Sequence, residues 1–341
     1  PTRIILVVIP ALNEARTIEG VVNSLRVDLP DQTDVRVVIA DGGSTDGTLE
    51  LVRRLSAADP ALRFFANPRR IQSAAVNLAV QRHGADADVL VRCDAHAHYP
   101  AGFVRRLLDT LDRTRADSVV VAMDSTGTGC FQKAVAWASN TWVGTGGSAH
   151  RGGHRSGFVD HGHHAAFRIA AFRRAGGYDE TFTHNEDAEL DCRQRALGSK
   201  IYLDADIRLD YQPRATVTAL ARQYFAYGRG RSRTVQRHPH AMRARQLALP
   251  VHLVMTTLAL ALAAWLPLLL LWPLAYVAVL AMASVSIAIR QRSSCGLLAG
   301  FAAAVMHVSW AAGFLSGLLF VREAAWRPAS AAPPIGVGRN G

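Results

Sequence analysis

The stretch Val35–Thr48, VRVVIADGGSTDGT, carries the pattern that decides the fold. Its first residues are β-branched and apolar, as in a buried strand, and Asp41 stands where that strand would end. Two glycines then form a polar turn, and Thr48 opens an amphipathic, helix-like stretch. A strand that leads through a tight turn into a helix is the repeating unit of a mainly parallel α/β sheet.

The same alternation recurs through residues 1–125 and once more near residue 200. We expect strands at Ile4–Ile9, Val35–Ala40, Arg63–Ala66, Val89–Cys93, Ser118–Val121 and Lys200–Leu203. We expect helices at Thr17–Leu29, Thr48–Ala57, Ile71–His83, Gly102–Arg113 and 186–197, the last capped by Asn185 and stopped by Gly198. Such a sheet binds ligands at the carboxyl ends of its strands, which is where the polar residues gather.

Two long uncharged runs, Leu247–Ile289 and Gly296–Val321, follow this part of the chain. A membrane-spanning helix needs about 20 apolar residues. Buried core helices are the alternative, but these are ordinarily amphipathic and shorter. We therefore expect a catalytic domain at 1–212, a basic interfacial helical segment at 213–246, about three transmembrane helices at 247–321 and a flexible tail at 322–341.

The formal net charge is +11, with 38 basic and 27 acidic residues. The arginines concentrate where the chain meets its apolar part, as the positive-inside rule and anionic lipid headgroups require, so we expect membrane lipids and no nucleic acid as partners. The cluster comprises Arg222, Arg229, Arg231, Arg233, Arg237, Arg243 and Arg245. Four widely spaced cysteines, Cys93, Cys130, Cys192 and Cys295, suggest a reducing compartment, and we expect no cleavable signal peptide.

Four motifs in order resemble the family-2 glycosyltransferases of the GT-A fold over residues 4–205. They are PALNEARTI (10–18), ADGGSTDGT (40–48), CDAH (93–96) and HNEDAEL (184–190). The further motifs FVDHGHHAAFR (158–168), GTGGSAHR (144–151) and RQYFAYGRGR (222–231) are similar to the ExoA type of bacterial exopolysaccharide glycosyltransferase, a membrane enzyme of succinoglycan assembly. The resemblance implies an inverting transfer from a nucleotide sugar, most often a UDP-sugar.

A leaving diphosphate needs a divalent cation and positive groups around it. Asp94 matches the first aspartate of the family's DxD motif, and His96 replaces the second. An imidazole shifts the preference from Mg²⁺ toward Mn²⁺. His96 either ligates the metal, directly or through water, or is a strand-end histidine bonded to a neighbour.

The resemblance also assigns the nucleotide site. Asp41 matches the aspartate that reads the uracil edge, and Pro10, Ala11, Asn13 and Glu14 match the loop around the base and ribose. Asn13 could instead cap a helix with Glu14 in its first turn, and both roles are compatible. Arg70 follows the third strand and is placed with the nucleotide-binding residues.

Asp187 matches the catalytic base of the family's ED pair, with Glu186 orienting the acceptor. The first turn of a helix favours an ionised carboxylate, as a general base needs at neutral pH. The alternative is a solvated helix start. Either Arg229 or Arg231 contacts the diphosphate, or both bind lipid headgroups. We assign the histidines of residues 150–164 to the substrate pocket, because their spacing lacks the pattern of zinc sites.

We therefore expect an enzyme at the cytoplasmic face of a bacterial inner membrane. Its donor would be a UDP-sugar, by resemblance UDP-glucose, and its acceptor a polyprenyl-diphosphate-linked saccharide. A membrane-anchored metal-dependent hydrolase using Asp94, His96 and the His161–His164 cluster is one rival. A non-catalytic saccharide-binding or lipid-binding membrane protein is another, and it predicts that Asp187 is dispensable.

Overall fold

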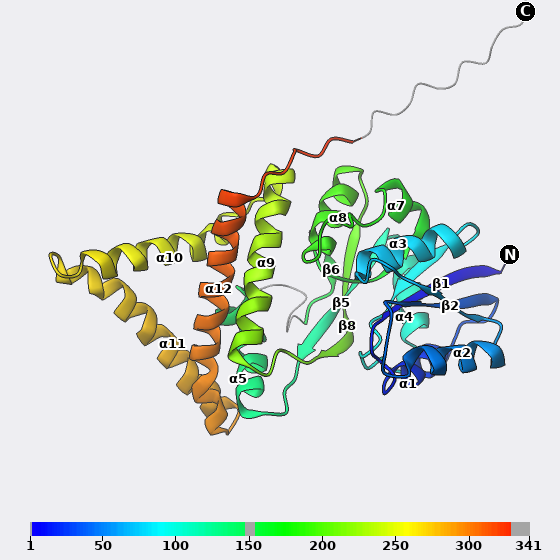
Figure 1. Cartoon of the computed structure of the whole chain (residues 1–341), viewed down its shortest axis with the longest axis horizontal. Helices are drawn as coiled ribbons and strands as arrows, with labels where there is room; N and C mark the ends of the chain where they lie inside the picture. Colours follow the sequence, from blue (N-terminus) through cyan, green and yellow to red (C-terminus); the bar gives the residue numbers. More distant parts are fainter. Residues whose placement is uncertain (1, 147–153, 329–341) are drawn as a thin grey trace, which may run out of the picture.

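The computed structural model describes residues 2–146 and 154–328. Its N-terminal part is built on an eight-stranded sheet with the order β3-β2-β1-β4-β7-β5-β8-β6 (Figure 1). The strands are β1 (Arg3–Ala11), β2 (Thr33–Asp41), β3 (Leu62–Ala66), β4 (Val89–Arg92), β5 (Ser118–Ser125), β6 (Gly157–Phe158), β7 (His163–Arg168) and β8 (Ile201–Tyr211).

The sheet is mixed and mainly parallel, which confirms the predicted α/β class. Strand β1 pairs in parallel with β2 and β4, and β5 pairs in parallel with β8. Strand β7 is antiparallel to both of its neighbours, β4 and β5. Strand β7, which is not among the strands expected from the sequence, therefore lies in the centre of the sheet. Its apolar residues, Ala165 and Phe167, are buried, but the adjacent histidines hide the pattern.

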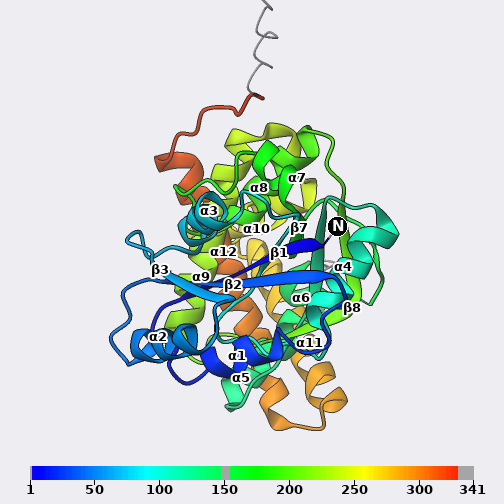
Figure 2. The ribbon, with the colours of Figure 1, turned by 90° about the vertical axis from the view of Figure 1, so that its right-hand side faces the viewer.

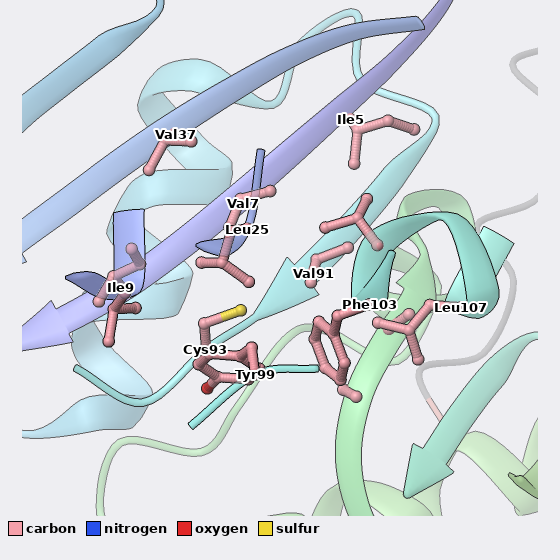
Figure 3. Packing of buried hydrophobic residues seen from close by; sticks show 14 of the residues in the cluster. Ile5, Val7, Ile9, Leu25, Val37, Val91, Cys93, Tyr99, Phe103 and Leu107 are labelled. Carbon is pink, nitrogen blue, oxygen red and sulfur yellow. The ribbon is translucent and has the colours of Figure 1, made fainter. Parts of the chain in front are cut away.

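Helices cover both faces of the sheet (Figure 2). Odd-numbered β1 residues such as Val7 pack with α1 and α4 in the cluster of Figure 3, whereas even-numbered ones such as Val8 pack with α3, α7 and α8. This period of two is the ordinary alternation of a strand buried on both faces. The helices are α1 (Ile18–Ser24), α2 (Thr48–Ala58), α3 (Gln72–His83), α4 (Phe103–Thr114), α5 (Cys130–Ser139), α6 (Trp142–Thr145), α7 (Ile169–Arg174) and α8 (Glu186–Ala196).

Two predicted boundaries are wrong. Helix α1 starts at Ile18 and ends at Ser24, well short of Leu29, and Asp28 already has a positive φ of 55°. Strand β8 continues to Tyr211, far beyond Leu203, because a register shift lets it follow β5 to its end. The other predicted strands and helices are present to within a few residues.

Helix α9 (Val217–Arg237) leaves the sheet and packs alongside α12 (Ala299–Phe320) (Figures 1 and 2). In the chain, α9 and α12 are separated by α10 (Ala244–Leu262) and α11 (Leu271–Arg290). These two helices form a hairpin that projects away from the sheet. The 3₁₀ segments are η1 (Pro239–Ala241), η2 (Pro267–Leu270) and η3 (Ser294–Leu298). Three apolar segments of the described chain are each long enough to cross a membrane: Ala244–Leu262, Pro267–Arg290 and Ser294–Phe320.

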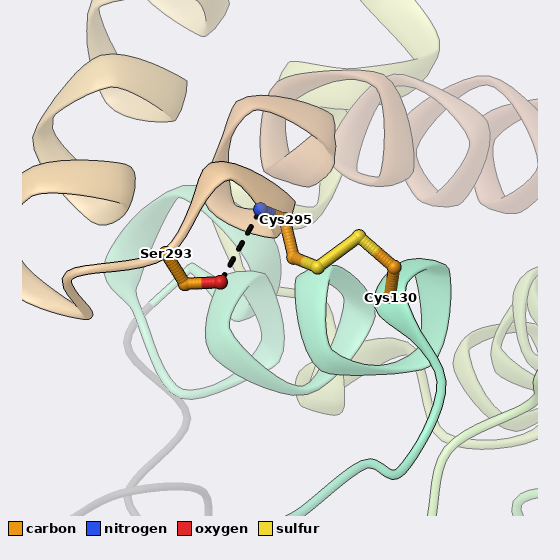
Figure 4. The surroundings of a disulfide bond; sticks show 3 residues. All are labelled: Cys130, Ser293 and Cys295. Atoms are coloured by element: carbon orange, nitrogen blue, oxygen red, sulfur yellow. Dashed lines mark hydrogen bonds between the residues drawn. A yellow bond between two sulfur atoms is a disulfide. The ribbon is translucent and has the colours of Figure 1, made fainter.

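A disulfide joins Cys130, the first residue of α5, to Cys295 in η3 (Figure 4). This disulfide does not fit the reducing compartment that the spacing of the four cysteines suggested. The two residues are 165 positions apart, and only the folded chain brings them together. Cys93 and Cys192 are buried free thiols. The disulfide ties the catalytic part of the chain to the start of its last apolar helix.

Candidate active site

The carboxyl ends of β1, β2 and β4 meet at one edge of the sheet, as the predicted strands require. A cavity of about 200 Å³ opens there. Its lining includes these predicted site residues: Pro10, Ala11, Glu14, Arg70, Asp94 and His96. The structure therefore brings together residues from three separate segments of the chain, and it adds Asn67 and Gln72 to the wall.

The loop after β2 is held in place by Asp41 and Asn13. The buried Asp41 carboxylate accepts hydrogen bonds from the backbone N–H of Gly43 (2.9 Å) and from the Ser44 hydroxyl (2.5 Å). Asn13 Oδ1 accepts the Thr45 N–H (2.8 Å). Asn13 does not cap α1, whose N-cap position is Thr17. Both predicted nucleotide residues shape this loop, and neither side chain is part of the cavity lining.

Arg70 reaches the same loop from the other side of the cavity. Its backbone adopts a positive φ of 56°, and its guanidinium lies so close to Gly43 that a Cβ there would be 3.2 Å from Nη2. Gly43 itself has a φ of +86°, which favours glycine. Arg70 thus places a cation beside a glycine-rich turn at the carboxyl ends of the strands. This arrangement is suited to binding a phosphate group.

Asp94 follows β4 and is anchored by two hydrogen bonds. Gln72 Nε2 donates to Asp94 Oδ1 (2.7 Å), and the Asp94 backbone N–H donates to the Tyr99 hydroxyl (2.6 Å). Burial opposes the negative charge of Asp94, but Arg92, His163 and His96 favour it more strongly, and the pKa of Asp94 is lowered. Asp94 is therefore a carboxylate at neutral pH, as a metal ligand must be.

His96 is not paired with Asp94. Its Nδ1 lies 2.9 Å from Glu14 Oε1, so the two predicted site residues bond to each other across the cavity. The imidazole nearest to Asp94 is His163 on β7, whose Nε2 is 3.9 Å from Oδ2. Within the described ranges, no group of three or more metal-ligating side chains is gathered. The donor set of one carboxylate and nearby imidazoles fits a divalent cation that takes its other ligands from a diphosphate and water.

Asp187, in the first turn of α8, is held by two side chains that sequence reasoning missed. Arg92 Nη1 donates to Asp187 Oδ1 (2.6 Å), and the Tyr178 hydroxyl donates to the same oxygen (2.8 Å). Arg92 also donates to the Tyr178 hydroxyl (3.1 Å), which closes a triangle. Since Arg92 lies two residues before Asp94 along the β4 strand direction, one strand serves both Asp94 and Asp187.

Glu186 lies beside this triangle in a different environment. Burial and the charge of Asp187 raise the pKa of Glu186 to about 7, against the opposing effect of Arg92. The preceding Asn185 occupies the N-cap position but makes no capping bond, so that prediction is wrong. Its side chain donates instead to the Tyr227 carbonyl of α9 (2.6 Å). The start of α8 is thereby fixed to α9.

Arg229 does not join the site. Its side chain is exposed on α9 and is absent from the cavity lining. Arg231 is largely buried near Cys192 and Asp191. Of the histidines, His161 Nδ1 lies 2.6 Å from Asp191 Oδ2, and His150 lies outside the described residues. The His161 position fits ion pairing, and the assignment of these histidines to the substrate pocket stays a prediction.

A buried ionic network connects α8 to α9 and to the residues after α12. Glu189 on α8 pairs with Arg193 (2.6 Å) and lies 3.1 Å from His238. Arg237 on α9 forms ion pairs with Asp179 and with Glu323 (2.6 Å). The network begins two residues after Asp187, so it fixes the helix that presents the carboxylate pair.

Comparison with known proteins places these residues in context. The model of the family described as glycosyl transferase family 2 matches residues 6–176. The succinoglycan biosynthesis protein ExoA of Rhizobium meliloti is 47% identical over 321 residues, which cover 93% of this chain and 96% of that protein. A second relative is the dolichyl N-acetyl-alpha-D-glucosaminyl phosphate 3-beta-D-2,3-diacetamido-2,3-dideoxy-beta-D-glucuronosyltransferase of Methanococcus voltae. It is 24% identical and aligns over 66% of this chain and 71% of that one.

Two solved structures share the fold. The mannosyltransferase PcManGT from Pyrobaculum calidifontis, in complex with GDP-Man and Mn²⁺, superposes with a TM-score of 0.54 at 23% identity, covering 89% of this chain and 86% of that one. GalNAc-T7 with UDP, GalNAc and Mn²⁺ gives a TM-score of 0.50 at 16% identity, covering 71% and 51% of the two chains.

Proposed function

Because the chain belongs to glycosyl transferase family 2, with a GT-A catalytic fold, we propose that it transfers glucose from UDP-glucose to a polyprenyl-diphosphate-linked saccharide during exopolysaccharide assembly. The name of the 47% identical relative supports the exopolysaccharide assignment. The name of the Methanococcus relative refers to a dolichyl-phosphate-linked sugar, and this supports a lipid-linked acceptor.

The observation that carries the proposal is the cavity at the carboxyl edge of the sheet. It combines the cation of Arg70, the carboxylate of Asp94 and a buried acceptor, Asn67 Oδ1, that has no hydrogen-bond partner within the described residues. An unpaired buried acceptor is costly unless a ligand donates to it. A nucleotide supplies such donors from its ribose and base, and its diphosphate needs the positive charge.

Asp94 would hold the divalent cation, Mn²⁺ in preference to Mg²⁺, with His163 or His96 as an imidazole neighbour. When bound, the cation would neutralise the charge that develops on the leaving diphosphate. Arg70 lies where it can add a second positive group near the same phosphates. We retain Arg229 only as a headgroup-binding candidate, because it lies outside the cavity lining.

Asp187 would act as the base. The acceptor hydroxyl loses its proton to Asp187 as its oxygen forms a bond to the anomeric carbon, while the bond to the diphosphate breaks with inversion. Arg92 and Tyr178 fix Oδ1 of this carboxylate and thereby its orientation. Glu186, close to half-protonated near pH 7, would orient the acceptor sugar by hydrogen bonding.

A donor screen tests the proposal. The full chain in detergent, given a panel of UDP-sugars with and without Mn²⁺, should release UDP fastest from UDP-glucose and only with the metal. Turnover of phosphoesters without a nucleotide sugar would instead support the hydrolase reading. Saccharide binding with no UDP release from any donor would support a non-catalytic protein.

A further inference from the structure

The last apolar helix, α12, is tied to the catalytic part of the chain at both of its ends. At its start, Cys295 in η3 forms the disulfide with Cys130 of α5 (Figure 4). Just after its end, Glu323 pairs with Arg233 and Arg237 of α9. A helix that crosses a bilayer places its two ends on opposite sides, so these two attachments already conflict with a crossing.

The middle of α12 also packs against the catalytic part of the chain. Ala302 and Met306 of α12 form a buried cluster with Val135 of α5 and Leu220 of α9. The next residue, His307, has its Nε2 2.7 Å from the Val143 carbonyl of α6. The contact with the catalytic part therefore extends along the first half of the helix.

Small residues continue this contact over the second half. A Cβ at Gly313 would overlap the Phe225 carbonyl, and a Cβ at Gly317 would overlap Ser232, both on α9. Conversely, a Cβ at Gly228 of α9 would overlap the Trp310 carbonyl of α12. Helices with small residues at their interface approach each other closely, and the two lie side by side in Figures 1 and 2.

Helix α9 cannot follow α12 into a bilayer. It carries Arg222, Arg229, Arg231, Arg233 and Arg237, and it is bound to the catalytic part of the chain. Tyr227 accepts a hydrogen bond from Asn185, Arg233 donates to the Thr181 carbonyl (2.7 Å), and Arg237 pairs with Asp179. Charged side chains in the hydrocarbon core are strongly disfavoured, and here the start of α8 would have to enter as well.

The α10–α11 hairpin has the opposite character. Its turn is uncharged and exposes Trp265 (75%) and Leu268 (78%), and among the residues that the structure describes it projects furthest from the sheet (Figure 1). The arginines flanking the hairpin lie at its open end: Arg243, Arg245, Arg290 and Arg292. Apolar turns seek hydrocarbon, and arginines at the base of a hairpin match the headgroups of one anionic leaflet.

We propose that α12 lies along the membrane surface and that, of the described apolar helices, only α10 and α11 enter the bilayer. The interaction surface is then the hairpin with the outer face of α12, its partner is an anionic lipid leaflet, and residues 322–328 stay on the same side as the catalytic domain. This replaces the three crossings expected from the sequence. The proposal is independent of the donor and acceptor assigned above.

Protease protection tests the topology in the full chain. One cleavable tag is inserted after Pro328, and a matched tag is placed before Thr2 on the catalytic domain. We expect the protease to cut both tags in the same preparation, either in spheroplasts or in inverted vesicles, and to cut neither tag in the other preparation. Cleavage of the two tags from opposite sides would overturn the proposal.

A matched pair of charge substitutions provides a second measurement. Val308, near the middle of α12, and Val279, near the middle of α11, are 47% and 51% exposed. A lysine on a surface helix can reach the headgroups, whereas one in the middle of a span cannot. Val279→Lys should strongly reduce the membrane-bound fraction, and Val308→Lys should leave it within about twofold of wild type. Equal loss in both variants would contradict a surface position for α12.

Discussion

Arg92 and Asp187, 95 residues apart in sequence, are joined by a 2.6 Å hydrogen bond between a buried guanidinium and a carboxylate at a helix start. Arg92 is the last residue of β4, and Asp94 follows two residues later, so the carboxylate expected to hold the cation and the one expected to accept the proton are both fixed at the end of one strand. In the proposed mechanism, this spacing would link the donor site to the acceptor site through the end of β4.

We expect Asp187→Asn to retain UDP affinity and lose on the order of 10² to 10⁴ in transfer rate, because a base contributes to the transition state and little to donor binding. Steady-state rates and UDP titrations on the same purified protein measure both quantities. Glu50→Gln is the matched control, since Glu50 is an exposed first-turn acid of α2. A folded Asp187→Asn protein with near wild-type transfer would end this assignment.

Tyr178→Phe should slow transfer roughly tenfold with an unchanged donor KM, because it removes one hydrogen bond to a charged group that orients the base. The ring should remain packed against Phe167 and Phe172, so melting should change little. In the Asp187→Asn background the same substitution should have almost no further effect on rate. Additive losses in the double variant would show that Tyr178 acts elsewhere.

Glu186 predicts a pH dependence of stability. Its pKa is raised from an ordinary value to about 7, so between about pH 4.5 and 7 the folded state binds more protons than the unfolded state, and the free energy of unfolding falls as pH rises. Glu186→Gln should therefore be more stable than wild type at pH 8, by roughly 1 to 3 kcal/mol, and similar to it at pH 5. Denaturant titrations at both pH values measure this difference. If Glu186→Gln were less stable than wild type at pH 8, burial of the ionised Glu186 carboxylate could not be destabilising as inferred.

Asp94→Asn should weaken UDP binding about tenfold or more when Mn²⁺ is present and change it little without the metal. His96→Gln is the comparison, because His96 bonds to Glu14 in the structure and we expect it to lose less. Calorimetric titration of UDP with and without Mn²⁺ separates the two. Undiminished Mn²⁺-dependent affinity in Asp94→Asn would remove Asp94 from the metal site.

Reduction of the Cys130–Cys295 disulfide should destabilise the protein. By chain-entropy arguments, closing a loop of this length contributes up to about 5 kcal/mol. Dithiothreitol should therefore lower the melting temperature of the wild type, while Cys130→Ser should melt lower from the outset and ignore the reductant. Cys295→Ser is the matched control and should behave identically. A reductant effect that persists in Cys130→Ser would point to a different origin.

The sequence predicted those features that depend on local pattern. The short apolar runs Ile4–Ile9 and Val35–Ala40 predicted strands that are buried on both faces, and the ends of the predicted strands placed Pro10 and Asp94 at one edge. Arg92 could have been found the same way, because in a strand it shares a face with Asp94. The roles of Tyr178, of the disulfide and of the α9–α12 contact depend on residues far apart in the chain, and no local period encodes them.

The pairing of Arg237 with both Asp179 and Glu323 bears on whether the catalytic domain is a separable unit. A fragment ending at residue 212 would keep Asp179 and the buried Glu189 but lose Arg237 and His238. Glu189 would keep Arg193 but lose its other partners, and a buried charge that loses partners is costly on the helix that carries Asp187. We therefore expect that residues 1–212 fused to a foreign membrane anchor would give a poorly ordered and slow enzyme. Variants designed to change acceptor specificity must keep α9 and the segment around Glu323 together with the sheet.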